Sequence, residues 1–257
     1  MNNSKQKAAK ERLSTVKQLK DKSIAIVKIK EILDDCPELI PGWVELGLCY
    51  RQTRAHALAL ETFEKALKLS PQNARIRIEL SIEQLHFGKL EDCQKNLQQL
   101  LAKDPERVRG IINLATVYQR QGQSERAIEL YKKALQVNPR THEATINLVE
   151  QLQKCDLYDE AVEYLQKATH HSPKHFGLLI CWGKLEQSRR DFSLALEYFQ
   201  KAIALYPDKI DGYFCQIEAL WKQNNYDEAI KQLEKLRSSH GDRYPVLIYS
   251  GDRKSVV

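Results

Sequence analysis

The chain has 257 residues, a formal net charge of +6, 42% hydrophobic residues and 29% charged residues. Ten glycines and eight prolines are too few for a disordered chain, and the apolar content is enough to bury one face of every helix. The excess positive charge lies in residues 1–30, where nine Lys and Arg stand against Glu11 and Asp21, and the nearly neutral remainder disfavours nucleic acid as the main ligand.

Six cysteines are spread along the chain without a CxxC pair, which disfavours a disulfide framework and a zinc ribbon. No apolar run approaches the roughly 20 residues that span a bilayer. We therefore expect reduced thiols, no membrane span and a soluble, cytoplasmic protein.

Residues 6–39 predict a first pair of helices. Leu13, Val16 and Leu19 form an apolar stripe in the first half. The second half carries apolar residues three and four apart, as in Ala25 and Ile29, and ends before Pro37. We interpret this segment as a degenerate N-terminal repeat, in which residues 6–20 act as a cap.

From Pro37 onward, prolines recur every 34 residues. They are Pro37, Pro71, Pro105, Pro139, Pro173 and Pro207. Because a proline inside a helix costs about 3 kcal/mol, six in the same phase mark six equivalent joints between helical units. A fixed period of this size predicts a solenoid of stacked helix pairs.

The units within residues 40–243 begin at equivalent positions. These are Ile40, Ala74, Val108, His142, Phe176 and Ile210. Each unit predicts two helices of about 12 to 14 residues, and short turns are expected at Gly88, Gly122, Asp156 and Asn224. Asn73, Thr141 and Asp208 are candidate N-caps.

Small and aromatic residues alternate at fixed slots of these units. The first unit carries Trp43, Leu46, Gly47, Tyr50, Ala59, Phe63, Ala66 and Pro71 in order, and the third repeats the pattern. This series resembles the tetratricopeptide repeat, which implies an all-α fold, a right-handed α-solenoid of about seven helix-turn-helix repeats. The resemblance covers residues 40–236.

In tetratricopeptide proteins the first helix of each pair lines a concave groove that binds peptides. The resemblance therefore implies ligand-groove positions along the first helices. These are Val44, Leu48, Ile78, Ile82, Ile112, Ile146, Ile180, Phe214 and Trp221. Such a strip suits a partly apolar peptide, and the alternative is that the same side chains pack against the neighbouring repeat.

Asn113 and Asn147 share one slot in consecutive repeats. This is similar to the asparagine ladder of O-linked N-acetylglucosamine transferase, in which each amide contacts the backbone of an extended peptide. The flanking repeats carry Glu79 and Cys181 at this slot, so ordinary surface asparagines are the alternative.

The repeat pattern ends after Leu236. Residues 244–251 predict a β-strand entering a turn. Within them, Pro245–Gly251 resembles the strand before the phosphate-binding loop of sulfotransferases. The last six residues, Asp252–Val257, match the translation of a common sequencing adapter. We therefore interpret residues 244–257 as a non-repeat tail, in which the start of a truncated second domain is followed by a sequencing artefact. A genuine short polar tail is the alternative.

The leading hypothesis is a protein-interaction scaffold that binds a peptide or protein segment in the concave groove. The alternative is the N-terminal region of a larger transferase, such as a sulfotransferase or glycosyltransferase, whose catalytic domain is absent from this chain. A third class is a nucleic-acid or membrane adaptor led by the basic first helix. We expect no catalytic motif, no cofactor and no metal: the histidines at 170, 171 and 175 predict a solvated turn. Self-association is expected through the uncapped last repeat.

Overall fold

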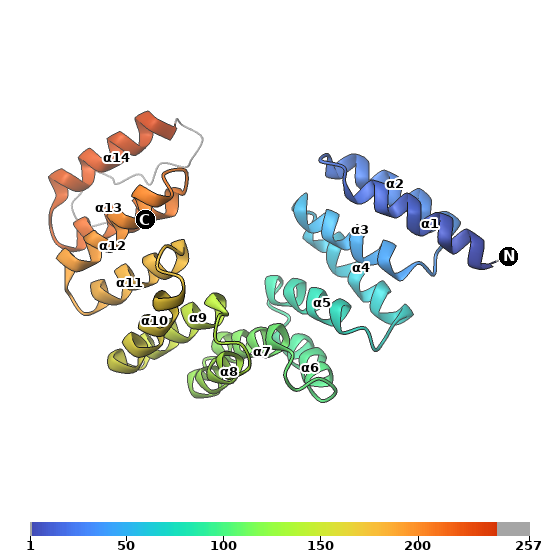
Figure 1. The fold of residues 1–257 in the computed structure, drawn as a ribbon, viewed down its shortest axis with the longest axis horizontal. Coiled ribbons are helices and arrows are strands. Elements are labelled where there is room, and N and C mark those ends of the chain that lie inside the picture. The colour runs from blue at the N-terminus through green and yellow to red at the C-terminus, as the bar shows by residue number, and fades with distance from the viewer. Residues whose placement is uncertain (1, 241–257) are drawn as a thin grey trace. The chain divides into compact units, whose positions relative to one another are not determined.

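The computed structural model of the protein describes residues 2–240, and all regular structure in this range is α-helical (Figure 1). The helices are α1 (Asn2–Lys17), α2 (Lys22–Asp35), α3 (Ile40–Gln52), α4 (His56–Leu69), α5 (Ala74–His86), α6 (Leu90–Leu101), α7 (Val108–Arg120), α8 (Ser124–Val137), α9 (His142–Lys154), α10 (Tyr158–His171), α11 (Phe176–Ser188), α12 (Phe192–Leu205), α13 (Ile210–Lys222) and α14 (Tyr226–His240). The strand and tail predicted over residues 244–257 lie outside the described range.

The helices follow the 34-residue register. The odd-numbered helices α3 to α13 begin at the six residues from which the repeat units were counted. Each of the six prolines lies in the joint between a second helix and the next first helix, as Pro71 does between α4 and α5. The prediction that these prolines mark equivalent joints is therefore confirmed.

The turn inside each repeat closes on one residue in the left-handed region. These residues are Arg54, Gly88, Gly122, Asp156, Arg190 and Asn224, with φ between 58° and 75°. The following N–H bonds back to the last helical turn, for example from Ala55 N to Tyr50 O at 2.8 Å. This bond pattern is a Schellman motif, which requires a positive φ. The four turn residues expected from sequence are confirmed, whereas the two arginines were missed because they are poor sequence signals for this conformation.

Helix caps were predicted less well. Asn73 accepts hydrogen bonds from Arg75 N and Ile76 N, at 3.1 and 3.2 Å, and is confirmed as an N-cap. Thr141 occupies an N-cap position but makes no capping bond. The prediction for Asp208 is wrong, because α13 begins one residue later with Lys209 at its N-cap. The side chain of Asp191 caps α12 instead, accepting from Leu194 N at 3.0 Å.

The chain divides into two compact units, Met1–Asn138 and Pro139–Val257. Unit 1 contains α1–α8 and unit 2 contains α9–α14. In each unit consecutive helices pack together, and first helices also contact first helices, as α5 does α7 and α9 does α11. The second helices make no comparable contact with one another in the described range. Each unit therefore curves with its first helices on the inner side and its second helices on the outer side.

In the first, third and fifth complete repeats, a small residue on the first helix faces a large ring on the second helix. An ideal Cβ on Gly47 would lie 2.6 Å from the ring of Phe63, and one on Gly183 would lie 2.2 Å from the ring of Phe199. The third repeat pairs a slightly larger Ala115 with Tyr131, and both are fully buried. At the N-terminal end, Leu13 of α1 is buried in the same cluster as Ile29 of α2. A small residue on the first helix thus makes room for a large ring on the second.

Candidate functional site

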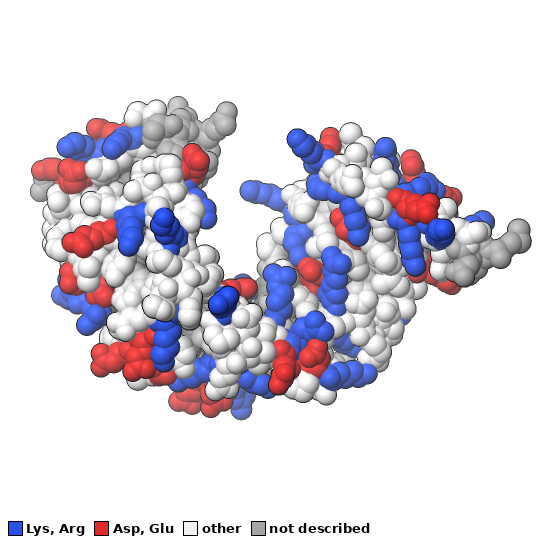
Figure 2. Space-filling model, viewed as in Figure 1, with Lys and Arg blue, Asp and Glu red and all other residues white. Residues whose placement is uncertain are grey.

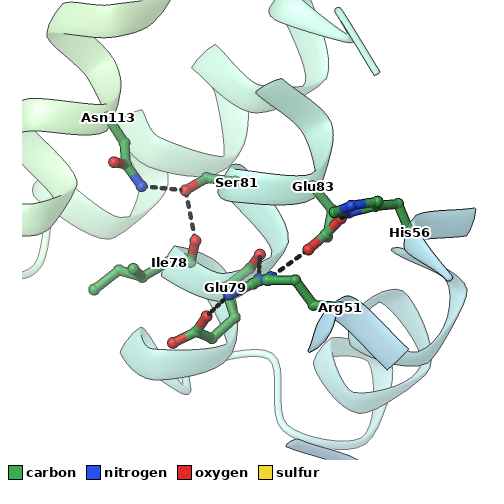
Figure 3. A network of polar contacts seen from close by, with 7 residues as sticks. All are labelled: Arg51, His56, Ile78, Glu79, Ser81, Glu83 and Asn113. Carbon is green, nitrogen blue, oxygen red and sulfur yellow. Dashed lines mark hydrogen bonds and ion pairs between the residues drawn. The ribbon is translucent and has the colours of Figure 1, made fainter. Parts of the chain in front are cut away.

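A buried ion-pair network joins the first two complete repeats, at α3 and α5 (Figure 3). Arg51 of α3 donates from Nη1 to Glu79 at 2.6 Å and from Nη2 to the Glu79 carbonyl at 2.9 Å. Its Nε donates to Glu83, whose side chain is 1% exposed. His56 Nδ1 lies 3.0 Å from the other oxygen of Glu83.

The contacts of this network serve to hold the two repeats together. The guanidinium of Arg51 also lies over the Phe63 ring at 5.3 Å, and His56 stacks on His86 with ring centroids 4.0 Å apart. Both carboxylate oxygens of Glu83 have a hydrogen-bond partner, and a carboxylate can be buried at low cost only when it is paired in this way. We conclude that Arg51 fixes α5 against α3. Sequence analysis missed it, because single charged residues on a helix usually indicate a solvated face.

The side-chain NH₂ of Asn113 makes a hydrogen bond to the preceding repeat. Its Nδ2 donates to Ser81 Oγ at 2.8 Å, and that hydroxyl donates to the Ile78 carbonyl at 2.7 Å (Figure 3). The chain of bonds ties α7 to α5. Asn147, in unit 2, makes no side-chain hydrogen bond within residues 2–240, so its amide has both its donor and its acceptor available.

The groove positions predicted in unit 1 are mostly covered. Val44, Ile78 and Ile112 are 5%, 7% and 2% exposed and belong to the packed core. Leu48 and Ile82 are half-buried against the same clusters. In unit 1 these side chains therefore chiefly join neighbouring repeats.

The groove positions predicted in unit 2 are more open. Ile146, Ile180, Phe214 and Trp221 are all half-buried. The Cδ1 of Ile146 lies where a side chain on Gly177 of the next first helix would point, and Phe214 and Trp221 pack at the edge of the last core cluster. The same slot that is sealed in unit 1 thus presents apolar surface in unit 2.

Lys184 is a cation on this more open face. It is exposed, stands one turn after Ile180 on α11, and its ammonium has no acidic partner among the described residues. The neighbouring first helices carry Glu150 and Glu218, but these pair with lysines of their own helices, at 2.9 and 2.6 Å.

A buried thiol, Cys181, and a partly buried one, Cys215, lie near Lys184. Burial raises the pKa of Cys181 to about 12 and raises the pKa of Cys215, while Lys184 lowers both. Because burial outweighs the lysine, the thiols stay protonated near neutral pH and are unsuited to nucleophilic chemistry.

The histidine-rich joint gives no sign of a metal site. His142 and His175 lie with ring centroids 4.3 Å apart, and His175 Nδ1 accepts from Leu178 N. Within residues 2–240, no group of three or more His, Cys, Asp or Glu has a geometry that could hold a metal ion. In the same range, no helix is both long and apolar enough to cross a bilayer.

Comparison with protein families agrees with this architecture. The family "Cytochrome c-type biogenesis protein H TPR domain" matches residues 3–145, "TT21 fifth ARM repeats domain" matches residues 110–205, and "Tetratricopeptide repeat" matches residues 182–245. The first match covers more than half of the chain. The protein belongs to the tetratricopeptide repeat family. No curated protein matches its sequence.

Solved structures share the fold. PilF of Pseudomonas aeruginosa is 20% identical, covers 84% of this chain and 99% of its own, and superposes with a TM-score of 0.66. A thermophilic tetratricopeptide repeat protein of Thermus thermophilus is 24% identical, covers 70% of this chain and 98% of its own, with a TM-score of 0.63. The type IV pilus biogenesis factor PilW is 20% identical, covers 81% and 94%, with a TM-score of 0.67. At these identities the likeness extends to the fold alone.

Proposed function

We propose that the protein is an interaction scaffold that holds a peptide segment of a partner on the inner face of its first helices, with the main contacts on unit 2. The observation that carries this proposal is the difference between equivalent slots. Ile78 and Ile112 are buried in unit 1, whereas Ile180 and Phe214 keep partly exposed apolar surface in unit 2. Partly exposed aliphatic and aromatic side chains in a row are typical anchors for a bound segment.

The charges on this face narrow the class of partner. Lys184 supplies a cation without an acidic partner beside the apolar strip, and Asn147 supplies an amide that can both donate and accept. A segment with apolar side chains and a carboxylate beside them fits both features. Affinity would then come from several modest contacts along the helices rather than from one deep pocket.

The proposal can be tested with peptides selected by phage display on the intact protein. We expect selected peptides to combine apolar and acidic residues and to lose about tenfold in affinity against Lys184→Glu, a change of about 1.4 kcal/mol. Lys201→Glu is the matched control, because Lys201 is also exposed but lies on the second helix α12. Selected peptides that bind both variants as tightly as the original protein would contradict the proposal.

A further inference from the structure

A second concave surface lies on the outer side of unit 1, away from the first-helix face. It is an open groove of about 380 Å³ between α2 and α4, with α3 as its floor, and we refer to it as the outer groove. The floor consists of Trp43, Leu46 and Tyr50 of α3, with Leu33 of α2 beside them. Leu33, Leu46 and Tyr50 are buried, and Trp43 is half-buried with its Nε1 donating to Pro37 O at 2.7 Å. The groove is therefore a firm apolar surface.

The rim of the outer groove carries exposed apolar side chains. Val27 of α2 is 57% exposed and precedes Lys30 of the rim by one turn. Ile24 is 50% exposed one turn earlier, and Leu58 of α4, which lines the groove, is 46% exposed. Leu58 thus adds exposed apolar surface to the groove itself, and Val27 and Ile24 add more along α2 towards its N-terminus, a combination that suits an interaction surface.

Two lysines hang over the aromatic floor. The Lys65 ammonium lies 4.0 Å from the centroid of the Trp43 ring, and the Lys30 ammonium lies 5.8 Å from that of Tyr50. Neither has an acidic partner within the described residues, although Asp34 and Glu61 stand on the same rim. Figure 2 shows that Lys and Arg are more widespread than Asp and Glu over α2 to α5 on the face drawn. The groove thus presents two cations above aromatic rings, without ion-pair partners of their own among residues 2–240.

In the next repeat, hydrogen-bonded side chains fill the equivalent space. Arg77 stands 34 residues after Trp43, and its guanidinium donates to Asn96 and Gln99, each at 2.9 Å. It also donates to Pro71 O at 2.9 Å. Asn96 and Gln99 stand in turn 34 residues after Thr62 and Lys65. One repeat therefore fills this space with a hydrogen-bonded plug, whereas its neighbour leaves it open and lined with rings.

We propose that the outer groove is a second interaction surface, which takes an amphipathic helix of a partner protein with aliphatic residues on one face and acidic residues beside them. The walls are helices whose backbone groups are already paired, so an extended strand would find no edge to bond to, whereas a helix satisfies its own backbone. The aliphatic side chains pack on Val27, Leu58 and the floor. The carboxylates meet Lys30 and Lys65.

The repeat itself supplies a variant that closes the groove. Trp43→Arg/Thr62→Asn/Lys65→Gln transplants the plug of the second repeat into the first. Leu58→Asp removes one exposed rim residue, keeps Trp43, and introduces the residue that the second repeat carries as Asp92. Because Leu58 is exposed, this second variant is expected to fold even if the first does not, which far-UV circular dichroism will check.

The probe is a synthetic helical peptide of about 14 residues, or roughly four turns, with leucines three and four apart flanked by glutamates. A matched peptide carries lysines in place of the glutamates. The chain has three tryptophans, so the indole N–H signals of Trp43, Trp182 and Trp221 can be followed separately in a ¹⁵N-labelled protein.

We expect the acidic peptide to shift the Trp43 signal, whether or not it also shifts Trp221 by binding to the inner face. Its affinity for the outer groove should fall about tenfold in Leu58→Asp and in the plugged variant. The lysine peptide should also bind about tenfold more weakly to the original protein. A shift at Trp221 instead, absence of any shift, or equal binding of the two peptides would overturn the proposal. A shift at Trp221 would leave the inner-face proposal intact, so the two proposals fail separately.

Discussion

The fifth repeat offers a direct test of the volume exchange between first and second helices. Gly183 of α11 faces the ring of Phe199 of α12, and Phe199 is fully buried. A Cβ at position 183 would lie 2.2 Å from Cε1 and 2.6 Å from Cδ1 and Cζ of that ring. Carbon atoms prefer separations of about 3.5 to 4.0 Å, so the ring would have to move by more than about 1 Å in a close-packed site.

Two opposing terms set the size of the effect of Gly183→Ala. Overpacking a core costs about 1–3 kcal/mol. Alanine inside a helix is favoured over glycine by about 1 kcal/mol. We therefore expect Gly183→Ala to lower the free energy of unfolding by about 1 kcal/mol.

The sign should reverse when the ring is removed. In a Phe199→Leu background the clash disappears and the helix term remains, so Gly183→Ala should then stabilise the protein by about 0.5–1 kcal/mol. The fourth repeat already carries the matching pair Val149 and Leu165 at these slots. Urea unfolding followed by far-UV circular dichroism, on the four proteins of the cycle, measures both changes. Equal effects of Gly183→Ala in the two backgrounds would refute the idea that the ring occupies this space.

Other features give further predictions. Arg54→Gly should raise the free energy of unfolding by about 1 kcal/mol, because Arg54 has a φ of 61°, which is costly for any residue but glycine. For the same reason Gly122→Ala should lower it by a similar amount. Shifts of the urea midpoint without a change of slope will show both effects. Arg51→Ala should destabilise the protein by about 3 kcal/mol, because a buried carboxylate loses its main partner, and a loss under about 1 kcal/mol would contradict the network. Stability should also fall between pH 9 and pH 12, because burial raises the pKa of Cys93 and of Cys181 to about 12. In that window the unfolded thiols have ionised and the folded ones have not, so the folded state binds more protons and each thiol contributes a loss of about 1 kcal/mol per pH unit. Cys93→Ala should flatten this slope in denaturation measured across the window.

The repeat architecture could be predicted from the sequence, because its causes are local. A proline can neither donate a helical hydrogen bond nor fit the preceding turn, so the spacing of Pro37 and Pro71 places a joint wherever the chain folds. Apolar residues three and four apart place one buried face on each helix. Gly88 and Asn224 mark left-handed turns, since these residue types adopt a positive φ at little cost.

Features that depend on contact between repeats required the tertiary structure. Ile112 and Ile180 occupy the same slot with the same side chain, yet the first is buried and the second is partly exposed. From the sequence, Arg51 resembles a surface charge, but in the structure it pairs with two carboxylates of α5. Trp43 resembles an ordinary core aromatic, but in the structure it lies on the floor of an open groove. Periodicity reports which face of a helix turns inward, but exposure and pairing depend on atoms more than 20 residues away. The sequence by itself therefore determined the stack of helix pairs, and only the packing of neighbouring repeats decided which surfaces remain available to a partner.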